Sequence, residues 1–205
     1  LRALAQDSPA VAVIFEARML GTLYQAFRPE SPALATSLAQ LGRSYMIAGR
    51  TEAAERVLAR IGSLIGNDPA EHTPGFLGVL QLRALLNAER GNIKDAEAGF
   101  VRAIAIAAKY GGVQGDAVGA YSFNLAALYL KAGRFREAID NFLKALEIFK
   151  RESGNNASVV GYALLGAAQA YKEIGDQAAS KALFATASEI LGPTIAAQRP
   201  KPNWL

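Results

Sequence analysis

The sequence predicts an all-α protein, folded as a right-handed superhelical solenoid of antiparallel helix hairpins. Two observations predict this class: an internal repeat of constant length and a composition rich in small helix formers. Alanine fills 41 of the 205 positions, 20% of the residues are charged, and cysteine is absent. Such a chain is too apolar to be disordered, and its alanine content favours closely packed helices over sheet.

The repeat is marked by four glycines, each 42 residues after the one before: Gly49, Gly91, Gly133 and Gly175. Their flanks are alike, reading AGRTEAAE, RGNIKDAE, AGRFREAI and IGDQAASK. A left-handed backbone costs least in a residue without a Cβ, so each glycine is expected to end one helix and open the turn to the next. A fixed period of this kind indicates stacked hairpins.

Residue types recur around each turn glycine at helical spacing. Small residues stand seven positions before and five positions after most of these glycines, where they let two antiparallel helices approach closely. Larger side chains stand four before and nine after: Tyr45, Asn87, Tyr129 and Tyr171, then Leu58, Phe100, Phe142 and Phe184. The larger set is expected to fill the wedge between one hairpin and the next.

The elements follow in order from these signals. The glycines and the linkers 66–75, 111–115 and 153–156 predict helix pairs over 33–48 and 51–65, 76–90 and 93–110, 115–132 and 135–152, and 157–174 and 177–191. We expect one repeat domain over 1–192, with a partial repeat over 1–30 and repeats over 33–66, 76–110, 115–152 and 157–191. A proline-rich tail over 193–205 follows, and the start at Leu1 without Met indicates a cropped or processed chain.

At this level of detail the chain resembles the tetratricopeptide repeat family. The match is best in NLAALYLKAGRFREAIDNFLKALEIF, from Asn124 to Phe149, and it extends over about 33–192. The usual repeat of the family has 34 residues, and eight more per repeat add about two helical turns. Repeats of this length are similar to the kinesin-light-chain type, which also occurs in bacterial scaffold and regulator proteins. Arg83, Asn87 and Ser180 depart from the pattern.

The resemblance implies protein binding by a non-catalytic scaffold, with a partner's peptide or helical segment in a concave groove lined by the first helix of each hairpin. The groove positions implied in this way are Arg43, Met46, Gln81, Leu85, Phe123, Asn124, Leu130, Tyr162, Leu165 and Gln169. Their centre is apolar, and an exposed apolar strip with polar ends is typical of a binding site. The alternative is that the lengthened helices tilt these residues into ordinary packing.

Other functions have weaker support in the sequence. We expect no enzyme, cofactor, metal or membrane span, because no nucleotide-binding or nucleophile motif appears and the single histidine, His72, stands in a loop. A net charge of +4 with interspersed basic residues does not favour a nucleic-acid binder, which would gather them on one face. A helical-repeat nucleic-acid binder and a peptide-sensing regulatory domain stay open as alternatives. The compartment is open, with cytoplasm favoured slightly over periplasm.

The ends of the repeat array form the last expectation. The fourth hairpin is expected to expose an apolar stripe, namely Tyr171, Leu183, Phe184, Ala187 and Ile190. Solenoids need a polar outer face on their terminal repeats. The tail, through Ile195 and Trp204, or a second copy of the chain in a homo-oligomer, would therefore cover this stripe.

Overall fold

The computed structural model describes residues 32–65, 76–111, 115–155 and 157–192, together with residues 18, 20–22, 25 and 26. The described residues form helices and the turns between them, with no strand among them. They fall into two compact units, divided between Leu82 and Arg83. His72, the tail over 193–205 and most of the partial repeat expected over 1–30 lie outside the described residues.

The first unit contains one complete helix pair and the start of a third helix. α3 (Pro32–Ile47) packs on α4 (Thr51–Ile65), and α5 (Leu77–Glu89) begins in this unit and continues into the second. Gly42 on α3 faces the Leu82 side chain so closely that a Cβ at residue 42 would overlap it. A side chain at residue 42 would therefore force the Leu82 side chain to move.

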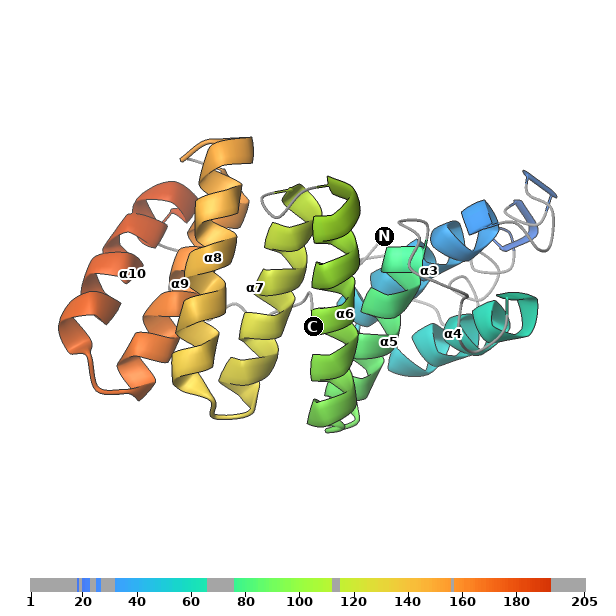
Figure 1. Ribbon diagram of the computed structural model, residues 1–205, viewed down its shortest axis with the longest axis horizontal. Helices are drawn as coiled ribbons and strands as arrows, with labels where there is room; N and C mark the ends of the chain where they lie inside the picture. The colour runs from blue at the N-terminus through green and yellow to red at the C-terminus, as the bar shows by residue number, and fades with distance from the viewer. Residues whose placement is uncertain are drawn as a thin grey trace. The chain divides into compact units, whose positions relative to one another are not determined.

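The second unit continues the array with five further helices. These are α6 (Ile93–Gly111), α7 (Asp116–Lys131), α8 (Phe135–Ser153), α9 (Ser158–Glu173) and α10 (Gln177–Leu191). α7 packs on α8 and α9 packs on α10 as hairpins, while the α6–α7 and α8–α9 contacts join successive repeats (Figure 1). Each of the eight helices from α3 to α10 begins and ends within one residue of the range expected from the sequence.

The turn glycines have the left-handed backbone that their spacing predicts. The φ angle of Gly133 is 74°, and those of the other three lie between 73° and 87°. Around Gly133, the amide of Arg134 donates to the Tyr129 carbonyl at 2.9 Å, and the glycine amide donates to Leu130 at 3.2 Å. The same pair of bonds recurs at all four turns. This is the Schellman ending, which satisfies carbonyls that a helix end would otherwise leave unpaired.

The core of the second unit contains the large side chains expected between hairpins. Phe100 and Phe142, nine residues after their turn glycines, are buried, with 0% and 2% of their surfaces exposed. A Cβ at Gly166 of α9 would overlap the ring of Phe142 on α8, so the ring lies directly against the α9 backbone. Each such ring contributes about 2 kcal/mol through the apolar area that it buries.

The hairpin α9–α10 differs from the earlier ones. Phe184, at the position of Phe142, is 44% exposed, and Tyr171, Leu183 and Ile190 are half-buried. The expectation that Ala187 is exposed is wrong, because its side chain is fully buried. Ala187 stands twelve residues after its turn glycine, as does the buried Ala145, so its position belongs to the packing within the hairpin.

Candidate functional site

The sequence places its candidate groove on the first helix of each hairpin. In the second unit these helices are α7 and α9, which contact each other. We define the inner row as the residues thirteen, ten, six and three positions before the turn glycine: Ala120, Phe123, Ala127 and Leu130 on α7, and Tyr162, Leu165, Gln169 and Lys172 on α9. The spacing of three, four and three residues keeps each set on one stripe of its helix.

The expectation of an exposed apolar strip is wrong at its centre. Leu85, Phe123 and Leu165 are buried, with 2%, 9% and 7% of their surfaces exposed. α7 is covered from several directions, because α6, α8 and α9 all contact it. The Phe123 ring meets Phe142 edge-on at 5.4 Å between centroids and lies 6.3 Å from Phe149. The alternative of ordinary packing therefore describes these three side chains.

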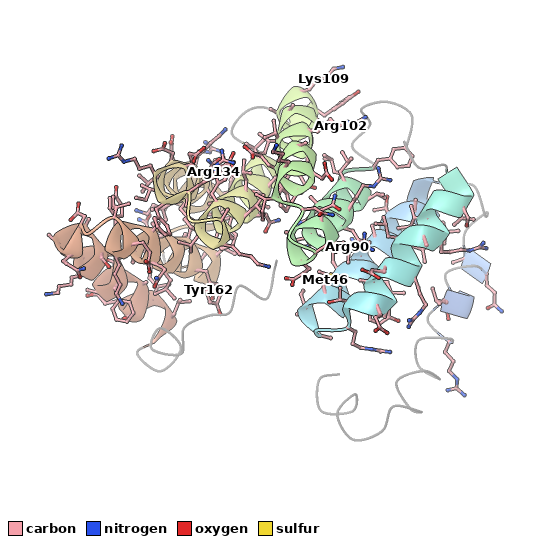
Figure 2. The ribbon with its side chains drawn as sticks, turned by 90° about the horizontal axis from the view of Figure 1, so that it is seen from below. Met46, Arg90, Arg102, Lys109, Arg134 and Tyr162 are labelled. Atoms are coloured by element: carbon pink, nitrogen blue, oxygen red, sulfur yellow. The ribbon has the colours of Figure 1, made fainter. Side chains whose placement is uncertain are left out.

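The accessible part of the inner row lies at its two ends. Tyr162 and Ala120, near the starts of their helices, are half-buried, as are Leu130 and Gln169 near the turns. The amide of Gln169 donates to the Glu173 carboxylate one helical turn later. Figure 2 shows Tyr162 on the side of the second unit opposite to Arg102 and Lys109 of α6. Tyr162 therefore lies on a side away from Arg102 and Lys109.

The other predicted groove residues are placed as follows. Asn124 on α7 is buried, beside the inner row in sequence. In the first unit Met46 and Gln81 are buried, while Arg43 on α3 is half-buried. The inner row of the second unit is consequently the part of the predicted site that the structure brings together.

A charged cluster between α6 and the α7–α8 turn was not predicted from the sequence. The Arg134 guanidinium donates to Glu97 at 2.6 Å and 3.2 Å, and to Glu137 on its own helix. The Tyr129 hydroxyl also donates to Glu97, at 2.8 Å. Arg134 lies 4.2 Å from the centre of the Tyr129 ring, a cation–π contact that joins the two ends of the Schellman turn. Arg50 and Tyr45 repeat this contact at 5.1 Å in the first unit.

The cluster shifts the ionisation of its members. The hydrogen bond from Arg134 holds the pKa of Glu97 below its ordinary 4.5, and the pKa of Glu137 falls for the same reason. Burial, followed by the bond to Glu97, raises the pKa of Tyr129 to about 12. Both carboxylates are therefore ionised and paired at neutral pH, which indicates a clamp between repeats rather than an acid–base site. The signal was present in the sequence as Tyr and Arg at fixed offsets from Gly49 and Gly133.

A surface cavity of about 460 Å³ lies in the last repeat, at the helix ends that are farther from the turn glycine Gly175. Its walls come from the end of α8, the loop after it, and helices α9 and α10: Lys150, Asn155, Val160, Leu164, Thr186, Glu189 and Ile190. The Thr186 hydroxyl donates a hydrogen bond to the Ala182 carbonyl at 3.2 Å. None of the predicted groove residues lines this cavity.

Within the described ranges, no group of three or more His, Cys, Asp or Glu side chains is placed to hold a metal ion. None of the helices in the described part of the chain is both long enough and apolar enough to cross a bilayer.

The family is shown by its sequence model. The tetratricopeptide repeat model matches residues 77–151 and again 116–191, which together span more than half of the chain. The chain therefore belongs to the tetratricopeptide repeat family, a family of non-enzymatic repeat scaffolds that generally mediate protein–protein interaction. No curated protein matches it in sequence.

Solved structures share the fold. BtubC (BKLC) from P. vanneervenii is 19% identical with a TM-score of 0.69, covering 85% of this chain and 70% of that one. Two structures of the nearly identical TPR-like repeats of a candidate kinesin light chain from Podosopora anserina are 20% and 19% identical. Their TM-scores are 0.65 and 0.63, and they cover 95% and 94% of this chain and 94% of each of those chains. The fold is the all-α repeat of antiparallel hairpins, with the long repeat of the kinesin-light-chain type.

Proposed function

We propose that this protein is a non-catalytic scaffold that binds a peptide or helical segment of a partner along the inner row of α7 and α9. The observation that carries the proposal is the pattern of exposure in that row. Leu130 and Tyr162 keep accessible apolar surface at its two ends, on either side of the buried Phe123 and Leu165. Accessible aromatic and aliphatic side chains are the anchors that peptide-binding surfaces use.

The dimensions favour a short ligand. From Ala120 to Leu130 the row runs ten residues along α7, about 15 Å at 1.5 Å per residue. A helix of about ten residues, or an extended segment of about five, covers that length. Gln169 and Lys172 at the turn end supply polar groups that would fix the direction of such a segment.

The test is selection of twelve-residue peptides from a random display library on the full chain, followed by fluorescence anisotropy. Selected peptides should carry apolar anchors, and Tyr162→Glu should weaken their binding at least tenfold. Val101→Glu is the matched control, because Val101 is an exposed apolar residue on α6 and should leave binding unchanged. Circular dichroism should show both variants as helical as the parent. Failure to select any peptide, or equal binding by the Tyr162→Glu variant, would refute the proposal.

A further inference from the structure

A second surface is revealed by comparing α10 with the helices that precede it by whole repeats. Lys181, Phe184 and Ser188 of α10 stand 42 residues after Ile139, Phe142 and Leu146 of α8. We call these three residues of α10 the stacking stripe. The three residues of α8 are buried, whereas Lys181 is exposed, Phe184 is 44% exposed and Ser188 is half-buried.

The repeat shows what covers this position elsewhere in the second unit. α8 packs on α9, and its Phe142 ring lies against Gly166, where no Cβ fits. In the preceding repeat Asn124 stands at the position of Gly166, and Phe100 is nevertheless fully buried. A helix that covered Phe184 in the same register is therefore not restricted to glycine at that position.

The first position of the stripe sets the charge of the partner. In α6 this position is Glu97, which binds Arg134, the residue directly after the next turn glycine. In α10 the charge is reversed, because the position holds Lys181. Lys181 forms no ion pair within the described part of the chain. The complementary partner carries a carboxylate after its turn, where Arg134 stands in this chain.

The same position disfavours a head-to-tail copy. In the first hairpin the residue after the turn glycine is Arg50, held over Tyr45. A second copy that stacked its α3–α4 hairpin on the stripe would bring Arg50 to Lys181, and like charges at an interface are repulsive. Head-to-tail contacts that do not close generate filaments, so this repulsion also opposes open-ended growth.

The composition of the stripe indicates a partner that binds reversibly. α6 and α8 keep aliphatic residues, Ile104 and Leu146, at the third position, where α10 has Ser188. The Ser188 hydroxyl donates to the Phe184 carbonyl at 2.8 Å, so this residue adds no unpaired donor. One exposed aromatic ring within polar surroundings is the composition of a partner interface rather than of a repeat core.

We propose that the stacking stripe of α10 docks a helical hairpin of another protein, which covers the Phe184 ring and places an aspartate or glutamate against Lys181. The surface is distinct from the inner row, so the two proposals can fail independently.

The probe is a fluorescein-labelled peptide of residues 157–192. In the register of the α8–α9 contact it presents Gly166 to the Phe184 ring and Asp176 to Lys181. Anisotropy titration with the full chain should show saturable binding. Phe184→Ala should weaken it about tenfold, as loss of a central aromatic anchor does. Leu143→Ala is the matched control, since Leu143 is an exposed apolar residue on α8 outside the stripe.

A charge exchange tests the pairing directly. Lys181→Glu should weaken binding about tenfold, because an attractive pair becomes a repulsive one. An Asp176→Lys peptide should bind the Lys181→Glu chain better than the parent chain, and the double-mutant cycle isolates this coupling from any loss of peptide helicity. If the peptide only displaced the chain's own α9–α10 hairpin from α8, neither substitution in the chain would weaken its binding.

Four results would overturn the proposal. The first is no saturable binding, and the second is binding that is indifferent to Phe184 and Lys181. The third is binding that appears only after residues 193–205 are deleted, because the tail would then be the occupant. The fourth is self-association in light scattering that Phe184→Ala abolishes, because a second copy would then be the occupant.

Discussion

Phe142 and Phe184 offer a controlled comparison, because they share a residue type and a position in the repeat but not an environment. Phe142 is 2% exposed and lies against Gly166, while Phe184 is 44% exposed. We expect Phe142→Ala to lower the free energy of unfolding by about 3–5 kcal/mol, since it removes apolar contact and leaves a cavity. Phe184→Ala should lose only the transfer free energy of a little more than half a ring, about 1 kcal/mol, with no enclosed cavity.

The assay is urea unfolding followed by circular dichroism at 222 nm, with thermal unfolding beside it. For a chain of this size each kcal/mol corresponds to about 2–4 °C in Tm, so Phe142→Ala should lower Tm by roughly 10 °C and Phe184→Ala by only a few degrees. Because repeats are coupled mainly to their neighbours, Phe142→Ala should also broaden the transition as the α9–α10 hairpin separates first. Equal losses in the two variants would refute the reasoning, because Phe184 would then be as fully packed as Phe142.

Two further predictions concern the turn between α7 and α8. Gly133→Val should destabilise the protein by more than about 1 kcal/mol, because a β-branched residue is strained at a φ of 74°; unchanged urea midpoints would contradict this. Glu97→Gln should flatten the acid side of the stability profile. The lowered pKa of Glu97 stabilises the fold above its ordinary 4.5, and this stabilisation is lost as the pH falls through the lowered value. Urea midpoints at pH 7 and pH 3 should therefore differ more in the parent than in the variant, and equal differences would exclude the ion pair with Arg134.

The helices and turns could be predicted because local rules determine them. A glycine with a left-handed backbone ends each first helix, and the residues at offsets of three, four and seven fix which side is buried. These features need no knowledge of how far one hairpin rotates against the next.

The exposure of the groove could not be predicted, because it depends on that rotation. Phe123 and Leu165 stand at positions that line an open groove in the resemblance, yet both are buried, and the Phe123 ring packs on Phe142 and Phe149 of α8. Helix spacing tells which residues share a stripe, but the angle between neighbouring hairpins decides whether a stripe is a surface or a floor. The Glu97–Arg134 clamp was missed for a related reason, because its partners come from different hairpins.

Two of the residues proposed for binding, Tyr162 and Lys181, are positions at which the repeats differ from one another. Tyr162 replaces Ala120 on the inner row, and Lys181 replaces Ile139 on the stacking stripe. Residues that every hairpin shares are needed for stacking, so changing them would cost stability in any scaffold of this design. A side chain that departs from the repeat and stays accessible contributes little to the stack, and is therefore available to recognise a partner. This distinction predicts that substitutions at Tyr162 and Lys181 change binding with little change in unfolding free energy, whereas substitutions at Phe142 do the reverse.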